Sequence, residues 1–300
     1  MSKRVLKTKN MVVALFAAAI LILSIFGYIS DAVGYLKELF LPAGAWYDGA
    51  YVEMLDVGQG DSTLLVSAGK AALIDTGIKS KASVVTKILK QKNINKLDML
   101  LITHNHTDHM GGVDVITADI PVKTFVTPDL RYTDERTDKM ERAIENVKAA
   151  GGKCVTAKKG YSITVGEFKI SVIGAYYKEK DENDRSIVTK AQIGKWKFLF
   201  TGDAQESTER RLLEDGENLK CDVLKVGHHG SMYSSTEEFL EAASPWLAMI
   251  SCGKGNRYSH PHDVVLMRLK EAGIQYQRTD TNGNVTYNIN EKEITVQTEK

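Results

Sequence analysis

Residues 104–109 constrain this chain more than any other feature, because three histidines and one aspartate fall within six positions. The segment is too polar for a core and has neither helical nor strand periodicity. Imidazole nitrogens and carboxylate oxygens bind zinc and similar divalent metals, and an open coordination position makes such a site catalytic. The pattern therefore predicts a catalytic metal centre, against the alternative of a histidine-rich surface loop.

The flanking residues place this segment at the end of a strand. Residues 97–103 form a short apolar run with the length of a buried strand. Gly111 and Gly112 follow the segment, and paired glycines permit a tight turn and a close approach of two backbones. Open α/β sheets bind ligands at the carboxyl ends of their strands. We therefore expect the metal ligands on a loop at such an end.

Four further motifs also stand just past predicted strands. They are residues 55–62 with Asp61, residues 73–77 with Asp75, residues 198–203 with Asp203, and residues 223–231 with paired histidines. A single aspartate in a turn is weak evidence, because aspartate is common in turns. Five polar motifs at five strand ends favour a metal centre over a chance accumulation of histidine.

The segment from His104 to His109 matches the H-x-H-x-D-H signature of the metallo-β-lactamase fold. The chain resembles more closely the hydrolase domain of the ComEC competence proteins, over roughly residues 50–290. The motifs that carry this resemblance are residues 55–62, 183–186, 201–203, 227–231, 256–261 and 278–280. The resemblance implies an α/β fold of four layers, an αββα sandwich, and the predicted alternation of strands and helices suits it.

ComEC proteins carry a multi-span channel domain before the hydrolase domain, whereas this sequence offers one membrane segment. Residues 11–29 contain no charged side chain. As a helix they would be about 28 Å long, which matches the hydrocarbon thickness of a bilayer. Lys3, Arg4, Lys7 and Lys9 precede this segment and predict that the N-terminus stays in the cytoplasm.

We accordingly expect a basic cytoplasmic tail (1–10), a single-pass transmembrane signal anchor (11–29), a linker (30–49) and a hydrolase domain (50–298). The hydrolase domain would lie on the extracytoplasmic side of the cell membrane. A cleaved signal peptide is the alternative, although its apolar region would be shorter.

The net charge of +1 gives no basic field of the kind that announces nucleic-acid binding.

The resemblance implies two divalent metal ions, zinc or manganese. The implied ligands are His104 and His106 for the first ion, Asp108 and His109 for the second, Asp203 between them, and either His228 or His229 to complete the second site. The choice between His228 and His229 stays open, with a preference for His229 because it directly precedes Gly230. Asp61 and Asp75 are expected to shape the site without binding metal.

Most lactamase-like hydrolases supply a third histidine to the first metal, but no histidine lies between His109 and His228 here. Residues 183–186, which match the ComEC pattern, occupy the equivalent stretch. The first metal would then be held by fewer protein groups, with water or substrate filling the gap. We expect Asn183 and Ser186 to contribute to substrate binding.

Asp108 and His260 are the predicted catalytic residues. Asp108 would act as a ligand or accept a proton from the attacking water. His260, together with Asn256 and Tyr258, would bind the phosphate or protonate the leaving group. The alternative is that His260 caps a helix predicted to begin near residue 262.

These features predict a metal-dependent extracytoplasmic phosphodiesterase, a nuclease that cleaves DNA and serves a competence-type uptake machinery. One alternative is a phosphocholine esterase, for which Tyr132, Tyr176, Tyr177 and Trp246 are candidates to form an aromatic cage around choline. Another small-ester hydrolase of the same fold, a lactonase or β-lactamase, is a further alternative. A non-enzymatic DNA-uptake component is disfavoured, because a binding module has no need of metal ligands.

Overall fold

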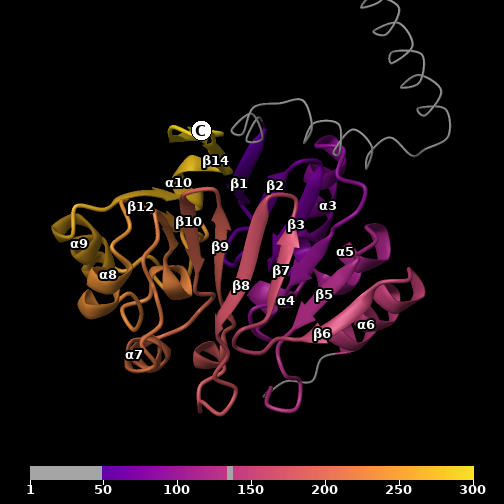
Figure 1. Cartoon of the computed structure of the whole chain (residues 1–300), viewed down its shortest axis with the longest axis horizontal. Coiled ribbons are helices and arrows are strands. Elements are labelled where there is room, and N and C mark those ends of the chain that lie inside the picture. The colour runs from indigo at the N-terminus through magenta and orange to yellow at the C-terminus, as the bar shows by residue number, and fades with distance from the viewer. Residues whose placement is uncertain (1–48, 134–137) are drawn as a thin grey trace, which may run out of the picture. The chain divides into compact units, whose positions relative to one another are not determined.

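Two β-sheets form the centre of the part of the chain that the computed structural model describes, residues 49–133 and 138–300. Figure 1 shows them packed face to face. The first sheet has the order β15-β14-β1-β2-β3-β4-β5-β6, and the second has the order β13-β12-β11-β10-β9-β8-β7.

The strands of the first sheet are β1 (Ala50–Met54), β2 (Thr63–Ser67), β3 (Lys70–Ile74), β4 (Met99–Leu101), β5 (Thr124–Thr127), β6 (Lys153–Thr156), β14 (Val285–Ile289) and β15 (Ile294–Thr298). Those of the second are β7 (Ser162–Val165), β8 (Phe168–Gly174), β9 (Val188–Ile193), β10 (Trp196–Phe200), β11 (Val223–Lys225), β12 (Leu247–Ile250) and β13 (Gln275–Arg278). The helices are α3 (Ala82–Gln91), α4 (Thr107–Met110), α5 (Val113–Asp119), α6 (Asp138–Ala149), α7 (Glu206–Glu214), α8 (Glu237–Ala243), α9 (Asp263–Glu271) and α10 (Thr279–Asn282).

Each sheet joins an antiparallel half to a parallel half. In the first sheet, β15 to β3 pair antiparallel and β3 to β6 pair parallel. In the second, β7 to β10 pair antiparallel and β10 to β13 pair parallel. The carboxyl ends of parallel strands meet at one edge of a sheet, where ligands bind in open α/β sheets.

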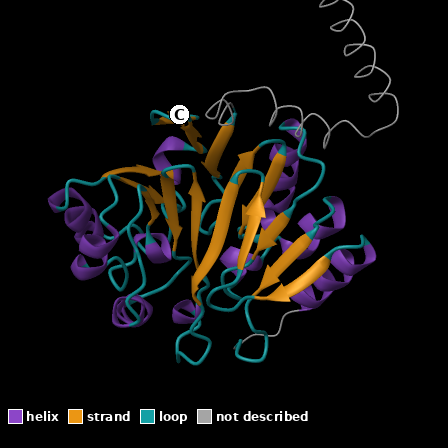
Figure 2. Cartoon of the chain, in the orientation of Figure 1, coloured by secondary structure: helices purple, strands orange, loops and turns teal. Residues whose placement is uncertain are grey.

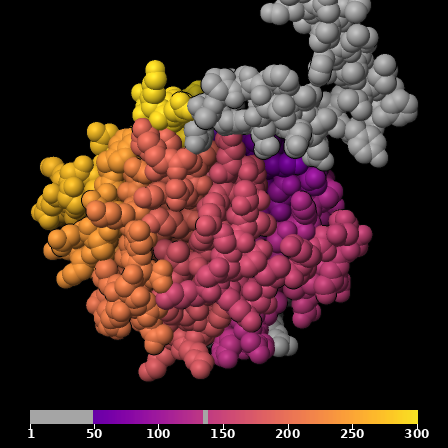
Figure 3. Space-filling model, viewed as in Figure 1, coloured from indigo at the N-terminus to yellow at the C-terminus, as the bar shows by residue number. Residues whose placement is uncertain are grey.

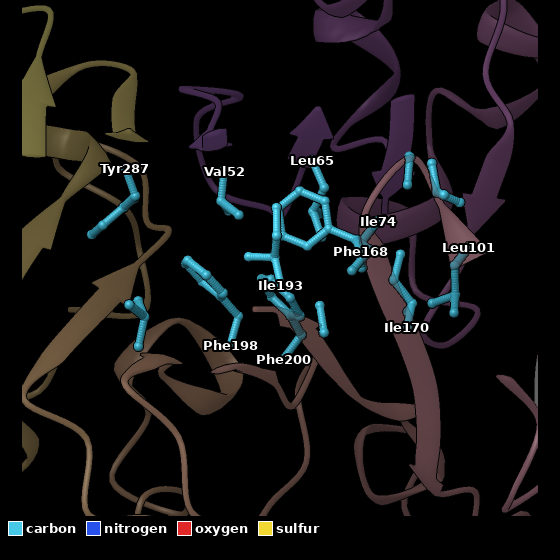
Figure 4. Close-up of a cluster of buried hydrophobic side chains, with 14 of the residues drawn as sticks. Val52, Leu65, Ile74, Leu101, Phe168, Ile170, Ile193, Phe198, Phe200 and Tyr287 are labelled. Carbon is cyan, nitrogen blue, oxygen red and sulfur yellow. The ribbon is translucent and has the colours of Figure 1, made fainter. Parts of the chain in front are cut away.

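The inner faces of the two sheets enclose a core of aliphatic and aromatic side chains, which Figure 4 shows around Phe168 and Phe198. The seven residues of β8 alternate between buried and more exposed positions, as a strand with one face on a core requires. The alternation of buried and exposed residues along the strands thus determines which side chains form the core between the two sheets.

Helices cover both outer faces, as Figure 2 shows. In α3, the residues Ala82, Val85, Thr86 and Leu89 are buried at helical spacing. Val85 and Leu89 pack in one hydrophobic cluster with residues of α5 and α6 on the outside of the first sheet. A third cluster holds α7, α8 and α9 against the second sheet, with Phe239 at 0% exposure. On the face shown in Figure 3, the surface coloured for the residues of β7 to β9 lies between the surface of residues earlier in the chain and that of residues later in the chain. The four-layer αββα sandwich expected from the sequence is confirmed.

Several elements differ from expectation. The strands β6, β7 and β13 were not anticipated, because they are short and largely exposed on their sheets. The segment that starts at His104 is not all loop, since α4 makes one helical turn from Thr107 to Met110. No helix within residues 49–133 and 138–300 is long and apolar enough to cross a membrane. The predicted tail, signal anchor and all but the last residue of the linker lie outside the described residues.

Candidate metal centre

The polar motifs found in the sequence converge at one edge of the two sheets. The segment after β4 supplies His104 to His109, the turn after β10 supplies Asp203, and the turn after β11 supplies His228 and His229. They border a pocket of about 370 Å³. Gly111 lies so close to the backbone of Lys79 that an added Cβ would be 2.8 Å from its nitrogen, so the close approach expected of this glycine is confirmed.

His104 and His106 point ring nitrogens at each other. Nε2 of His104 and Nδ1 of His106 lie 3.1 Å apart. Two nitrogens bound to one tetrahedral zinc would lie roughly 3.3 Å apart, given zinc–nitrogen bonds of about 2.0 Å. This pair therefore has the spacing of two ligands of a common metal.

A second group surrounds the carboxylate of Asp203. Its Oδ1 lies 3.1 Å from Nε2 of His109, and its Oδ2 lies 3.3 Å from Nε2 of His229. The same nitrogen of His229 lies 3.3 Å from Oδ2 of Asp108. Asp203 thus stands between the two rings and directs one oxygen at each.

The donor atoms of this group fit a cation. Nε2 of His109, Nε2 of His229 and Oδ1 of Asp203 are buried and have no hydrogen-bond partner among the described residues. Leaving buried polar atoms unsatisfied is costly, so native structures rarely do so without a bound group. Nitrogen and carboxylate donors at these separations suit zinc or manganese.

The two adjacent histidines differ in position. His229 is 1% exposed and within 3.3 Å of two carboxylates, whereas the side chain of His228 is 22% exposed and its Nε2 is 3.8 Å from Asp203. Both have left-handed backbones, with φ of 46° and 55°. Such conformations are strained for residues other than glycine and are characteristic of functional sites. The geometry favours His229 as the ligand and places His228 on the pocket wall.

Four of the candidate ligands, His104, His109, Asp203 and His229, are held from behind. Asp75 accepts hydrogen bonds from the backbone and hydroxyl of Thr103, both at 2.8 Å, and lies 2.8 Å from Nδ1 of His109. The Ser186 hydroxyl accepts from the backbone nitrogen of Asp203 at 3.0 Å and lies 3.3 Å from Nδ1 of His104. Partners of this kind fix the ring orientation of metal-binding histidines.

Charge in this group is strongly coupled. Burial alone would lower the pKa of His109 and of His229, but the surrounding carboxylates, Asp203 foremost, together outweigh it and raise both. Burial would raise the pKa of Asp203, but the two imidazoles hold it well below its usual range. Metal binding requires neutral imidazole, so a cation entering here would displace protons from these rings.

Lys225, at the end of β11, is a site residue that sequence reasoning missed. It is 2% exposed, and its Nζ lies 2.5 Å from Oδ2 of Asp61 and 3.0 Å from the carbonyl oxygen of Gly202. The signal was a lysine inside the otherwise apolar run Val223–Val226. Asp75 lies at Nδ1 of His109, and Asp61 lies at Nδ1 of His229.

The predicted substrate-binding residues fall into two groups. Asn183, Tyr258 and His260 line the pocket. Ser186 and Asn256 do not, because Ser186 contacts His104 and the Asn256 amide donates to the carbonyls of Gly253 and His260 and so holds their loop.

His260 has the position of a site residue. Its ring centroid lies 5.3 Å from that of His228, and its Nδ1 is buried without a hydrogen-bond partner in the described part of the chain. It does not cap a helix, because α9 begins at Asp263 and its N-cap residue is His262. The helix-cap alternative is therefore wrong.

The chain belongs to the metallo-β-lactamase superfamily, whose family model matches residues 55–254. Among curated proteins it is similar to ComE operon protein 3 of Bacillus subtilis, with 32% identity over 79% of this chain and 32% of that protein. It is also similar to competence protein ComA of Neisseria gonorrhoeae, with 30% identity over 80% of this chain and 32% of that protein. A shorter stretch is 31% identical to exodeoxyribonuclease YycJ of Bacillus anthracis, over 33% of this chain and 36% of that protein.

The similarity to competence proteins expected from the motifs is thereby confirmed. The chain spans about a third of the length of the curated relatives it matches. Its family consists generally of metal-dependent hydrolases, often with two divalent metals, and the cluster of Asp61, His109, Asp203 and His229 is a candidate site for such an ion.

Proposed function

We propose that this chain is a metal-dependent phosphodiesterase that cleaves DNA on the extracytoplasmic side of a membrane. One observation carries the proposal above all. The Asp203 carboxylate directs one oxygen at His109 and the other at His229, at 3.1 and 3.3 Å. A carboxylate placed in this way is suited to bind one cation jointly with both imidazoles.

Two sets of residues would hold the cations. His104 and His106 form the first set, and Asp108, His109 and His229 form the second, with Asp203 between them. Divalent cations bound there would supply an activated water and would neutralise charge at phosphorus. Asp75, Ser186 and the carbonyl of Ser251 fix the far sides of three of the rings.

The pocket wall offers neutral polar groups to a phosphate diester. Burial and then the neighbouring His229 and His228 lower the pKa of His260 to about 4, so its imidazole is uncharged near pH 7. A neutral imidazole can donate an N–H to a phosphate oxygen or to the leaving oxygen. The Oδ1 atom of Asn183 is also buried with no hydrogen-bond partner in the described residues, so this oxygen can accept a hydrogen bond from a water or from a donor group of the substrate.

The chain's relatives favour DNA as the proposed substrate. Two are competence-type proteins, and a shorter match is named as an exodeoxyribonuclease. The apolar segment 11–29 supports a membrane anchor and an extracytoplasmic hydrolase domain. On that side of the membrane the domain would meet incoming DNA together with a competence-type uptake machinery.

No observation favours phosphocholine as the substrate. An aromatic cage needs several rings around a quaternary ammonium group. The candidates Tyr132, Tyr176, Tyr177 and Trp246 are all absent from the described lining of the pocket, where Tyr258 is the one tyrosine. The phenol of Tyr176 instead donates to Asp215.

The test uses the purified full chain in detergent, stripped of metal and then supplied with zinc or manganese. Single- and double-stranded DNA, bis-p-nitrophenyl phosphate and p-nitrophenyl phosphocholine are offered in parallel, with Asp203→Ala as the inactive control. We expect metal-dependent cleavage of DNA. Cleavage of the small esters alone, with DNA left intact, would overturn the nuclease proposal and leave a phosphoester hydrolase.

A further inference from the structure

Lys225 is the one buried lysine of the metal centre among the described residues, and neither ligand binding nor orientation of the rings accounts for it. It ends β11, which lies between β10 and β12 in the parallel half of the second sheet. Burying an ammonium group away from water is strongly unfavourable unless it is paired and hydrogen-bonded. A lysine retained at such a position therefore calls for a specific partner.

Asp61 is that partner. Its Oδ2 lies 2.5 Å from the Lys225 ammonium, while Oδ1 of Asp203 lies 3.8 Å away. The carbonyl oxygen of Gly202 accepts a hydrogen bond from the same ammonium at 3.0 Å. The Lys225 ammonium is therefore paired with a carboxylate and hydrogen-bonded to a carbonyl oxygen, as a buried cation requires.

Asp61 stands on the far side of His229 from the candidate ligands. Its Oδ1 lies 3.2 Å from Nδ1 of His229, whereas Asp108 and Asp203 lie at Nε2 of that ring. The Ser251 carbonyl oxygen lies 2.9 Å from the same Nδ1. Asp61 is nonetheless close enough to the cluster for its carboxylate to lie within 4.8 Å of the ligand atoms. It is therefore a potential ligand that the structure holds back.

We propose that Lys225 is a positioning residue that acts as a built-in cation of the metal centre, and that it keeps Asp61 out of the coordination shell. The inference rests on the proposed metal centre and goes beyond it. The ammonium group neutralises one of four nearby carboxylates, those of Asp61, Asp75, Asp108 and Asp203. Metal ions then meet a site with less negative charge, which weakens their binding and fixes which carboxylates they contact.

The proposal predicts opposite signs for two substitutions. Lys225→Met removes the cation and frees Asp61, so the affinity for zinc should rise, by roughly tenfold or more, because a like charge near the metals is lost. Asp61→Asn leaves the ammonium unpaired beside the metals, so the affinity should fall by a similar factor. The double variant, which carries both changes, should return close to the wild-type affinity.

The measurement is a competition between the full-length protein in detergent and a chromophoric chelator, with zinc and then manganese, at one fixed pH. Metal content by mass spectrometry gives a second readout that does not depend on activity. A purely structural role for Lys225 would weaken metal binding in both single variants, and the double variant would not restore it. That result would overturn the proposal.

Two further outcomes are distinguishable. If the wild-type protein binds neither metal, the proposed function and this inference fail together. If the wild-type protein binds metal and Lys225→Met binds it equally or more weakly while folded, the inference alone fails. Should Lys225→Met not fold, the pair of Asp61→Asn and the double variant decides: loss of affinity in the first and recovery in the second supports the inference, and no recovery overturns it.

Discussion

The floor and the rim of the candidate site are built on different principles. The floor consists of Asp61, Asp75, His109, Asp203, Lys225 and His229, none of which is more than 4% exposed. The rim consists of Asn183, Tyr258 and His260, which line the pocket, and Tyr258 is 46% exposed. On the floor, Asp75 and the Ser251 carbonyl oxygen hold Nδ1 of His109 and of His229, whereas Nδ1 of His260 on the rim has no hydrogen-bond partner in the described residues.

The difference separates residues that bind the metal from residues that determine turnover or substrate preference. Braced, buried groups hold a metal with little reorganisation, and their replacement should change metal binding itself. Rim groups can be exchanged without disturbing the metal, and their replacement should change turnover or substrate preference alone. Four substitutions test this division, two in the floor and then two in the rim, from the largest expected effect to the smallest within each.

Asp203→Ala attacks the centre of the floor. We expect hydrolysis of bis-p-nitrophenyl phosphate to fall roughly a thousandfold, with loss of bound metal, because one carboxylate serves both candidate cation sites. Metal content and kcat are measured on the same sample. Asp119→Ala is the matched control, since that carboxylate is exposed and forms an ion pair with Lys90 at 2.6 Å. Full activity in a folded Asp203→Ala protein would refute the binuclear mechanism.

Asp75→Asn tests the bracing behind the floor. The substitution keeps the size of the side chain but removes the charged acceptor 2.8 Å from Nδ1 of His109. Loss of such an orienting group typically costs about 10- to 100-fold in metal affinity. Chelator competition measures it. An unchanged affinity would mean that Asp75 serves the fold, through Thr103, and not the metal centre.

His260→Ala tests the rim. We expect kcat to fall about a hundredfold, a typical effect of removing a proton-transfer or hydrogen-bonding group, with metal content unchanged. His260→Asn, which keeps an N–H donor, should recover part of the loss. Because the pKa of His260 is lowered to about 4, its neutral form persists from pH 8 down to about pH 5, so this residue should produce no inflection in the pH profile there. Metal loss in His260→Ala would move the residue from the rim to the floor.

Tyr258→Ala should give the smallest effect. We expect KM for oligonucleotides to rise about fivefold through loss of a surface for base stacking, with no change for bis-p-nitrophenyl phosphate. Tyr258→Phe, which keeps the ring, should behave as the wild type. Equal effects on both substrates would exclude base recognition by this ring.

Sequence reasoning reached the four layers and most of the candidate site because both depend on local patterns. His104 to His109 are adjacent in the chain, so their chemistry is visible before any folding is considered. The strands around the inner core alternate clearly, whereas β6 and β7 are short and have too few buried positions to reveal a period.

The parts that could not be predicted depend on contacts between distant segments. Lys225 and Asp61 become partners only when the end of β11 meets the loop between β1 and β2. The same limit applies to Asn256, whose residue type suits substrate binding but whose amide is used by its own loop. Residue type gives the chemistry a side chain can perform, and the tertiary fold decides whether that capacity is already taken.

The sheet order has a consequence for the timing of synthesis. The histidine segment emerges from the ribosome well before Asp203 and His229, and β14, which pairs with β1 in the first sheet, follows later still. A nascent chain that exposes its first imidazoles therefore lacks the carboxylate that joins the two halves of the site. The candidate metal centre is therefore completed late, after residue 229 has been made and the second sheet has packed on the first.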